Sequence, residues 1–311
     1  MATKDIYTQN KSNNDEKDSF AQIAKNYVAL TKPRIIELLL VTTVPTMFLA
    51  SGGWPNWILV LNTFIGGALA AGGANALNNV VDRDIDALMT RTAHRPLVTG
   101  KVSVRGAVAL GLTLSLMSVI WLQSSVNTLS AILAASAIVF YVCIYTLLLK
   151  RRTSSNIVWG GAAGCFPVLI GWSAVTNSIG LAPIILFLIV FWWTPPHYWP
   201  LSMQYKNDYA NAGIPMLPVV SENIKVANQI IIYSFIMSLT TLILPFTVEL
   251  SIYYWTGAII LNAFFIKEAF ALRGRITNQI QELLPMKLFN YSITYLALLF
   301  LLIGIDPLIS K

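Results

Sequence analysis

The sequence predicts an all-α protein that crosses a membrane nine times. Only 11% of its 311 residues are charged, whereas soluble domains carry about 25%, and its mean hydropathy is +0.64. Apolar stretches of about 20 residues, long enough to cross a hydrocarbon core of about 30 Å, recur along the chain. Basic residues are missing from every second connection between these stretches. Together these observations predict a bundle of membrane-spanning helices.

The nine expected spans are residues 35–53, 57–80, 104–123, 128–149, 156–175, 180–200, 226–248, 251–270 and 288–306. Short connections, near 54–56, 124–127, 176–179 and 249–250, hold no Lys or Arg. All but one of the 21 Lys and Arg residues lie before the first span or near the longer connections, and the exception is Lys311. The positive-inside rule therefore places the N-terminus in the cytoplasm and the C-terminus outside. It also explains the net charge of +7, so we expect no nucleic-acid partner.

Residues 1–26 are polar and mix acidic residues with Lys, which predicts a disordered cytoplasmic tail. Residues 27–311 are expected to form one integral-membrane domain. Its two long inner connections, about 81–103 and 200–225, follow the second and sixth spans, and such paired loops can cap one cavity.

An acidic cluster follows the second span. Asp82, Asp84 and Asp86 lie within five positions, directly after a long uncharged stretch. Asn78, Asp82 and Asp86 recur every four residues, so on a continuing helix they share one face. Charged side chains near a membrane-spanning segment are costly and mark a functional site by default.

Basic side chains accompany this cluster on the inner side of the membrane, at Arg91, Arg95, Lys150 and Arg151. Carboxylates alone repel phosphate, but carboxylates that hold Mg²⁺ bind phosphate oxygens through the metal. Arg and Lys then neutralise the remaining charge. The pattern therefore favours a metal-bridged diphosphate site, and the alternative is a solvated loop whose charges only set the topology.

Four ordered blocks of sequence resemble the UbiA-type intramembrane prenyltransferases, and within them the branch that farnesylates haem. The blocks are residues 75–96, with Asn78-x3-Asp82-x3-Asp86 at their centre, 145–151, 156–161, and 193–199 continuing to 208–218. The resemblance covers residues 27–305. It implies a UbiA-like helical bundle in a bacterial cytoplasmic membrane.

The resemblance also implies roles for individual residues. Asn78, Asp82 and Asp86 would organise Mg²⁺ and the head of farnesyl diphosphate, and Tyr145 would line the reacting end. Arg91, Arg95, Lys150 and Arg151 would contact the diphosphate. Many relatives carry a second aspartate-rich motif on the sixth span. At the matching place this chain keeps only Asp208 as a further metal ligand, and Lys206 would replace part of the lost charge.

His197 lies on the sixth span, beside Pro195 and Pro196. Haem is one expected partner of this His, through iron or a propionate, since His is a common axial ligand. The alternative is a hydrogen-bonded structural His next to prolines that interrupt the helix. Trp199 is expected to stack on the porphyrin.

The expected reaction is transfer of the farnesyl group of farnesyl diphosphate to a vinyl group of haem b, which gives haem O for haem-copper oxidases. The resemblance implies, as a further partner, a downstream enzyme that modifies haem O or an oxidase assembly factor. Two other functions stay open. One is prenyl transfer to an aromatic acid or quinone precursor, and the other is secondary transport of an anionic solute.

Overall fold

The computed structural model describes residues 19–309, for residues 34–40 the backbone alone. Within that range the chain forms helices and no β-strand. The helices of the first half are α1 (Phe20–Leu30), α2 (Pro33–Ser51), α3 (Trp57–Val81), α4 (Arg83–Leu88), α5 (Val104–Ser125), α6 (Thr128–Val139) and the π-helix η1 (Phe140–Leu149). Those of the second half are α7 (Asn156–Gly160), the 3₁₀ helix η2 (Gly161–Cys165), α8 (Phe166–Thr176), α9 (Leu181–Gln204), α10 (Lys206–Asn211), α11 (Leu217–Val220), α12 (Asn223–Ile243), the 3₁₀ turn η3 (Leu244–Phe246), α13 (Ile252–Thr277) and α14 (Pro285–Ile309).

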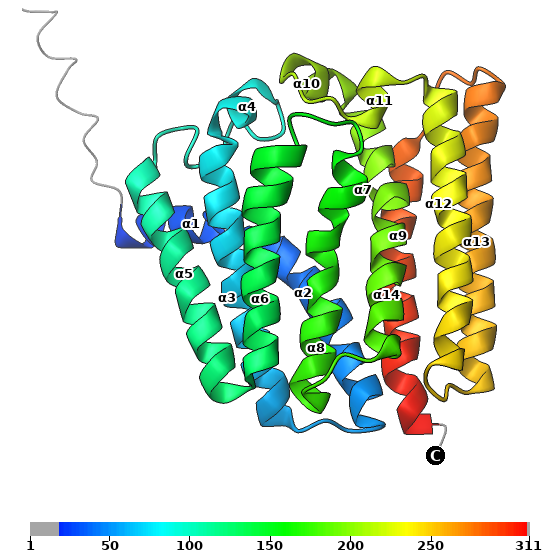
Figure 1. Ribbon diagram of the computed structural model, residues 1–311. Coiled ribbons are helices and arrows are strands. Elements are labelled where there is room, and N and C mark those ends of the chain that lie inside the picture. The colour runs from blue at the N-terminus through cyan, green and yellow to red at the C-terminus, as the bar shows by residue number, and fades with distance from the viewer. Residues whose placement is uncertain (1–18, 310–311) are drawn as a thin grey trace, which may run out of the picture.

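The long helices run side by side in one bundle (Figure 1). Eight helical segments among the described residues are long and apolar enough to cross a membrane. The first expected span, residues 35–53, coincides with α2. Its part Val41–Ser51 is apolar but shorter than the eight spanning segments. The all-α membrane fold is therefore confirmed. Nine spans were expected, and eight of the described helical segments are long enough to cross the membrane.

The expected disordered tail, residues 1–26, differs from the structure at its end. Helix α1 begins at Phe20 and runs across the bundle rather than along it (Figure 1), while residues 1–18 lie outside the described part. Its C-terminal end is anchored by the bundle, because the Asn75 and Asn79 amides of α3 donate to the carbonyls of Thr31 and Leu30. The helical part of the chain therefore starts before the expected domain boundary.

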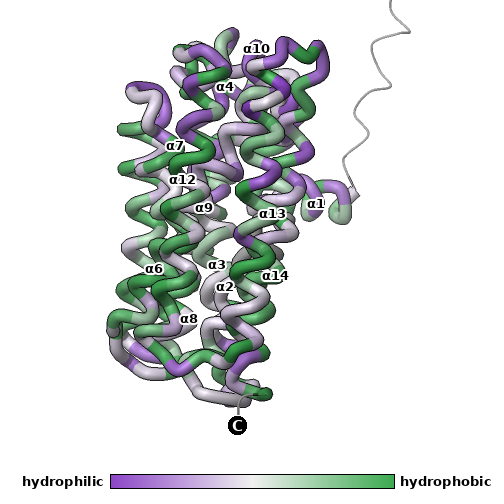
Figure 2. Tube along the Cα trace, turned by 90° about the vertical axis from the view of Figure 1, so that its right-hand side faces the viewer, coloured by the Kyte–Doolittle hydropathy of each residue, from purple (hydrophilic) through white to green (hydrophobic). Residues whose placement is uncertain are grey.

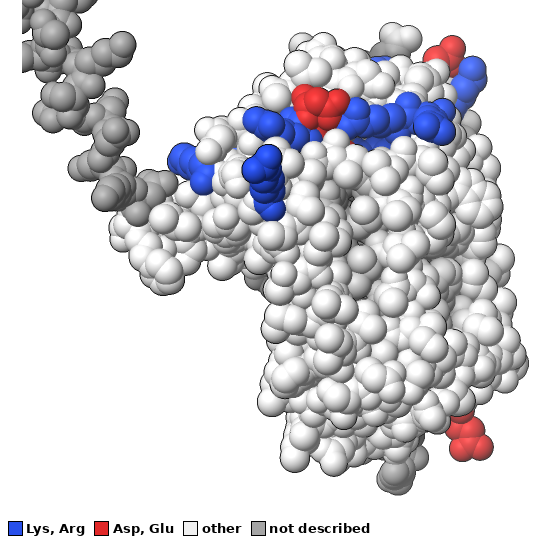
Figure 3. All heavy atoms as spheres, turned by 60° about the vertical axis from the view of Figure 1, so that its left-hand side comes forward, with Lys and Arg blue, Asp and Glu red and all other residues white. Residues whose placement is uncertain are grey.

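Polar residues collect at one end of the bundle. Hydrophilic segments gather around α4 and α10, whereas the length of the bundle is mostly apolar (Figure 2). On the face drawn in Figure 3, Lys and Arg form a band at the same end. We call this the charged end of the bundle.

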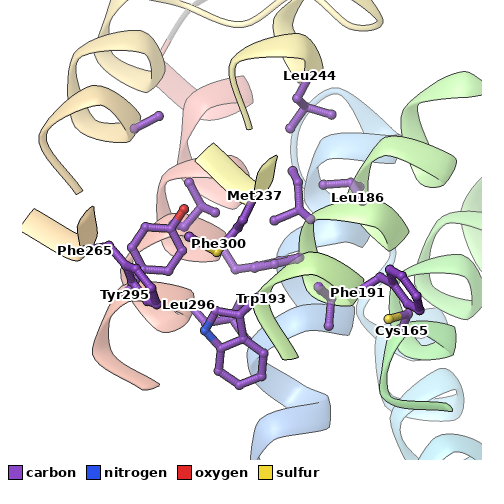
Figure 4. Close-up of a cluster of buried hydrophobic side chains, with 14 of the residues drawn as sticks. Cys165, Leu186, Phe191, Trp193, Met237, Leu244, Phe265, Tyr295, Leu296 and Phe300 are labelled. Atoms are coloured by element: carbon purple, nitrogen blue, oxygen red, sulfur yellow. The ribbon is translucent and has the colours of Figure 1, made fainter. Parts of the chain in front are cut away.

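The core lies mainly among α8, α9, α12, α13 and α14. Its largest cluster contains Phe191, Trp193, Met237, Phe265 and Tyr295, which Figure 4 shows packed between the helices. On the other side of the bundle α3 lies close against α5. A Cβ on Gly73 would lie 2.8 Å from the Gly111 carbonyl oxygen, so this close approach needs a glycine, as is common between membrane helices.

Candidate active site

The candidate site begins where α3 ends, at the charged end. Asp82 connects α3 to α4, and helical hydrogen bonding continues through it. The Asp82 N–H donates to the Asn78 carbonyl over 2.9 Å, and the Asp86 N–H donates to the Asp82 carbonyl over 2.8 Å. The helical spacing expected for Asn78, Asp82 and Asp86 is therefore retained across the boundary between the two helices.

Asp82 is the most enclosed carboxylate of the cluster, with a side chain that is 1% exposed. Its Oδ2 accepts hydrogen bonds from Lys150 Nζ at 2.5 Å and from Asn78 Nδ2 at 2.8 Å. Its Oδ1 is buried and has no hydrogen-bond partner among the described residues. A buried acceptor without a partner costs about 1–3 kcal/mol, so this oxygen is suited to bind a cation.

Lys32 enters the site from the turn between α1 and α2. Its Nζ donates to Asn78 Oδ1 over 2.7 Å. Its backbone takes a left-handed conformation, φ 52° and ψ 66°, directly before Pro33, and such strain concentrates at functional sites. Burial, followed by repulsion from Arg95 and Lys150, lowers the pKa of Lys32 to about 7. A bound anion would relieve this repulsion.

Asp86 pairs with a different cation. Its Oδ2 lies 2.5 Å from Arg95 Nη1, and Arg95 also donates to Asn79 Oδ1 over 3.1 Å. The Asp86 side chain is buried, while that of Arg95 is partly exposed. Arg95 is therefore fixed beside the cluster with guanidinium surface still accessible.

Asp84 faces away from this cluster. Its side chain is 64% exposed, and both its oxygens accept from the Arg151 guanidinium, at 2.6 and 2.7 Å. This hydrogen bonding to Arg151 holds the pKa of Asp84 below its usual value. Arg151, an expected diphosphate contact, is therefore paired with a surface carboxylate.

The second long connection contacts the first through Thr90 and Arg91. Arg91 Nη2 donates to the Tyr209 hydroxyl over 3.2 Å, and its guanidinium lies 5.4 Å from the centre of the Tyr205 ring. Thr90 donates to Asp208 Oδ2 over 2.7 Å. The two inner connections therefore meet, as the sequence predicted. Lys206, at the start of α10, is partly buried.

Among the side chains that the structure describes, no three of His, Cys, Asp or Glu gather in a way that could hold a metal ion by themselves. The carboxylates alternate with cations instead. This donor set still fits Mg²⁺, which is typically held by one or two carboxylates plus oxygens of the substrate. The unpartnered Asp82 Oδ1 is the protein oxygen best placed for it, whereas Asp208 is engaged by Thr90.

An apolar cavity of about 290 Å³ lies below this polar cluster. Asn75 and Tyr141 line it, and the Tyr141 hydroxyl donates to Asn75 Oδ1 over 3.4 Å. The Thr146 hydroxyl connects the two regions, because it donates to the Tyr141 carbonyl over 2.8 Å and accepts from Asn78 Nδ2 over 3.1 Å. Tyr145 stacks on Tyr141, with ring centres 5.6 Å apart. The cavity therefore continues directly from the polar site.

His197 also lines this cavity. Its ring is stacked between Trp193, at 4.1 Å, and Phe289, at 4.6 Å. Its Nδ1 lies 2.6 Å from the Ser292 hydroxyl, which leaves Nε2 as the nitrogen for any ligand. Trp199, in contrast, is buried in the core, 5.4 Å from the Tyr233 ring centre. The two residues expected to bind haem thus lie in different surroundings.

Comparison with known proteins decides the family. The pattern of the UbiA prenyltransferase family matches residues 39–293. The chain belongs to this family. It is accordingly a prenyltransferase and a multi-pass membrane protein.

Curated relatives of this UbiA prenyltransferase match it over almost their whole length. A protein of Streptomyces avermitilis named protoheme IX farnesyltransferase is 55% identical over 93% of this chain and 95% of its own. A protein of the same name from Clavibacter sepedonicus is 52% identical over 93% of this chain and 94% of its own.

Solved structures share the fold. A digeranylgeranylglyceryl phosphate synthase superimposes with a TM-score of 0.73 at 16% identity, covering 92% of this chain and 98% of that one. A UbiA homologue from Archaeoglobus fulgidus, bound to DMAPP and Mg²⁺, has a TM-score of 0.65 at 17% identity and covers 90% of this chain and 99% of that one. At these identities the likeness confirms the UbiA fold.

Three residues of the site in this UbiA prenyltransferase are not among those that the sequence predicts. Lys32 lies before the first span, where the sequence alone indicates only a topological charge, although a Lys-Pro pair directly before a span is a visible signal. Thr146 and Tyr141 had no signal in the sequence, because their placement depends on the π-helix. There the Thr146 hydroxyl reaches the carbonyl five residues earlier.

Proposed function

We propose that this UbiA prenyltransferase transfers the farnesyl group of farnesyl diphosphate to a vinyl group of haem b, with Mg²⁺ at the diphosphate. Relatives at 55% and 52% identity carry the name protoheme IX farnesyltransferase. The observation that carries the proposal is the buried, unpartnered Asp82 Oδ1 among Lys32, Arg95 and Lys150, above an apolar cavity. This arrangement suits an amphiphile with an anionic head and an isoprenoid tail.

In this proposal the cations of the site bind the diphosphate as its charge grows. The allylic C–O bond breaks, and both its electrons leave with the diphosphate. Lys32, Lys150 and Arg95 lie around the acidic cluster and act in a largely desolvated site, where fixed charges stabilise a transition state most strongly. Mg²⁺ held by Asp82 and Asp86, with Asn78 beside them, would supply further charge neutralisation. Arg91 would close the site from the side of Tyr209.

The cavity then protects the cation. The farnesyl carbon that has lost diphosphate is attacked by the π-electrons of the haem vinyl group, which forms the new C–C bond. Water adds to the resulting haem-side cation and loses a proton, which gives the hydroxyethylfarnesyl side chain. Apolar walls delay water until the C–C bond has formed. We propose that His197 contacts the porphyrin through Nε2, that Tyr145 lines the reacting end, and that Trp199 supports the helix from the core.

We further propose that the charged end faces the cytoplasm of a bacterial cell, with the N-terminus inside and the C-terminus outside. The described Lys and Arg residues near the helix ends support this orientation.

Mass spectrometry of extracted haems tests the proposed function. Membranes containing the protein are incubated with haem b, farnesyl diphosphate and Mg²⁺, alongside Asp82→Asn membranes. A hydroxyethylfarnesyl haem that disappears in the variant is the expected result. Prenylation of a benzoate or quinone precursor, with haem left unmodified, would overturn the proposed acceptor. A product that forms equally well after Mg²⁺ is chelated would overturn the role of the metal.

A further inference from the structure

Gly164 is a glycine that neither the backbone nor the packing requires. It does not adopt a positive φ. A Cβ on Gly160 would lie 2.1 Å from the Tyr145 ring, and one on Gly161 would lie 2.8 Å from Thr194, but one on Gly164 would meet no atom within 4 Å. Gly164 is exposed, and the space beside it is open.

That space belongs to the cavity below the polar site. Gly161, Gly164 and Pro167 all line it. Gly161 and Gly164 are three residues apart in the 3₁₀ helix η2, where such residues lie one above the other, and Pro167 follows in the first turn of α8. A side chain at position 164 would therefore extend into or across this cavity.

The prenyl chain is the occupant that this part of the cavity fits. Among the described residues that line the cavity none is a Lys, Arg, Asp or Glu, so a porphyrin propionate would find no charged partner among them. Gly67, Ala70, Ala71 and Ala74 continue the wall along α3 from Asn75. Because Asn75 lies one turn from Asn78, a chain held at its diphosphate would extend from the polar site along this wall.

The position of Gly164 along its helix places it beside the isoprenoid tail of the prenyl donor and away from the diphosphate head. Gly164 follows Asn156, the start of α7, by eight residues, half of them in the 3₁₀ helix η2, or roughly 14 Å of helical rise. His197 lies seven residues, or roughly 10 Å, from the end of α9 at Gln204. The head of the donor is bound beyond both levels, at Asp82.

We infer that the missing side chain at Gly164 determines which prenyl chain lengths this enzyme accepts, a specificity role that rests on the proposed function. A side chain there would occupy volume that the distal isoprene units need, and leave the diphosphate site and the first units unobstructed. Steric exclusion of one or two carbon atoms from an apolar pocket commonly changes selectivity by about 10-fold or more.

The test compares geranyl, farnesyl and geranylgeranyl diphosphates as donors to haem b, with products measured by mass spectrometry. The wild type is compared with Gly164→Ala, Gly164→Val and Gly164→Leu. Gly274→Leu is the matched control, because a Cβ at Gly274 also meets no atom within 4 Å but lies on α13, away from the cavity. Size-exclusion profiles of the purified proteins identify variants that fail to fold, and the graded series leaves smaller substitutions to measure.

We expect the ratio of geranyl to farnesyl transfer to rise with side-chain size at position 164, by about 10-fold or more for Leu, and geranylgeranyl transfer to fall furthest. Gly274→Leu should keep the wild-type ratio. An unchanged ratio in the folded Gly164 variants, or an equal loss for all three donors, would overturn the inference. A wild type that prenylates haem from none of the donors would instead overturn the proposed function.

Discussion

Neutralising Asp82 should affect activity far more than neutralising Asp84, two positions away. Asp82→Asn keeps the size of the side chain but removes the charge that Lys150 and the proposed metal share. Asp82 is 1% exposed, whereas Asp84 is 64% exposed and pairs with Arg151 at the surface. The two variants therefore separate the buried site from the surface charge.

The structure gives the expected magnitudes. Removing one preorganised charge or donor at a reacting centre lowers turnover by about 10²–10³-fold. Asp82→Asn should also destabilise the protein, because breaking a buried ion pair costs about 3–5 kcal/mol. Asp84→Asn breaks an exposed pair, of a kind that contributes about 0–1 kcal/mol, and should change turnover little.

The assay measures initial rates of prenylated haem formation at saturating donor, with thermal unfolding in detergent as the control for folding. Adding Asp82→Asn/Lys150→Met tests the ion pair itself. The double variant should recover part of the stability lost in Asp82→Asn, but not the activity. Equal activity of Asp82→Asn and Asp84→Asn would refute the assignment of Asp82 to the site.

Three further variants test other contacts. Lys32→Met should raise the Kd of farnesyl diphosphate roughly 10–150-fold, because a hydrogen bond to a charged group contributes about 1.5–3 kcal/mol. The control is Lys25→Met, at an exposed position. Equal Kd values for the two variants would contradict the role of Lys32. Gly160→Ala should displace the Tyr145 ring and lower stability by about 1–3 kcal/mol, and a thermal midpoint like that of the wild type would contradict the clash. Asp306→Ala should lower the stability of the protein by about 1–3 kcal/mol, because the buried carboxylate accepts a hydrogen bond from the backbone N–H at the start of α13. Transfer activity should be kept. A loss of activity in folded protein would contradict a purely structural role.

Hydropathy predicted the bundle well, because each span is a local property of about 20 residues. It predicted the helix boundaries less well. Helix α3 ends at Val81 and a separate α4 begins at Arg83, although the hydrogen bonds continue through Asp82. The four-residue spacing expected for Asn78, Asp82 and Asp86 is therefore kept across the boundary between the two helices.

Long-range pairing could not be read from the sequence. Asn78 and Lys32 are 46 positions apart, and Asp82 and Lys150 are 68 apart, so only the packing of α1, α3 and η1 brings them together. Arg151 illustrates the same limit, since its neighbour Lys150 turns towards Asp82 while Arg151 binds the exposed Asp84. Trp199 comes two residues after His197, about 200° further round α9, and packs into the core, a difference that composition does not reveal.

A structure with Mg²⁺ and a non-hydrolysable farnesyl thiodiphosphate bound would test the central claim most directly. We expect the metal about 2.0–2.1 Å from Asp82 Oδ1, the diphosphate contacting Lys32, Lys150 and Arg95, and the farnesyl chain passing Gly164. A diphosphate bound away from Asp82, or a chain that leaves this cavity empty, would contradict the account.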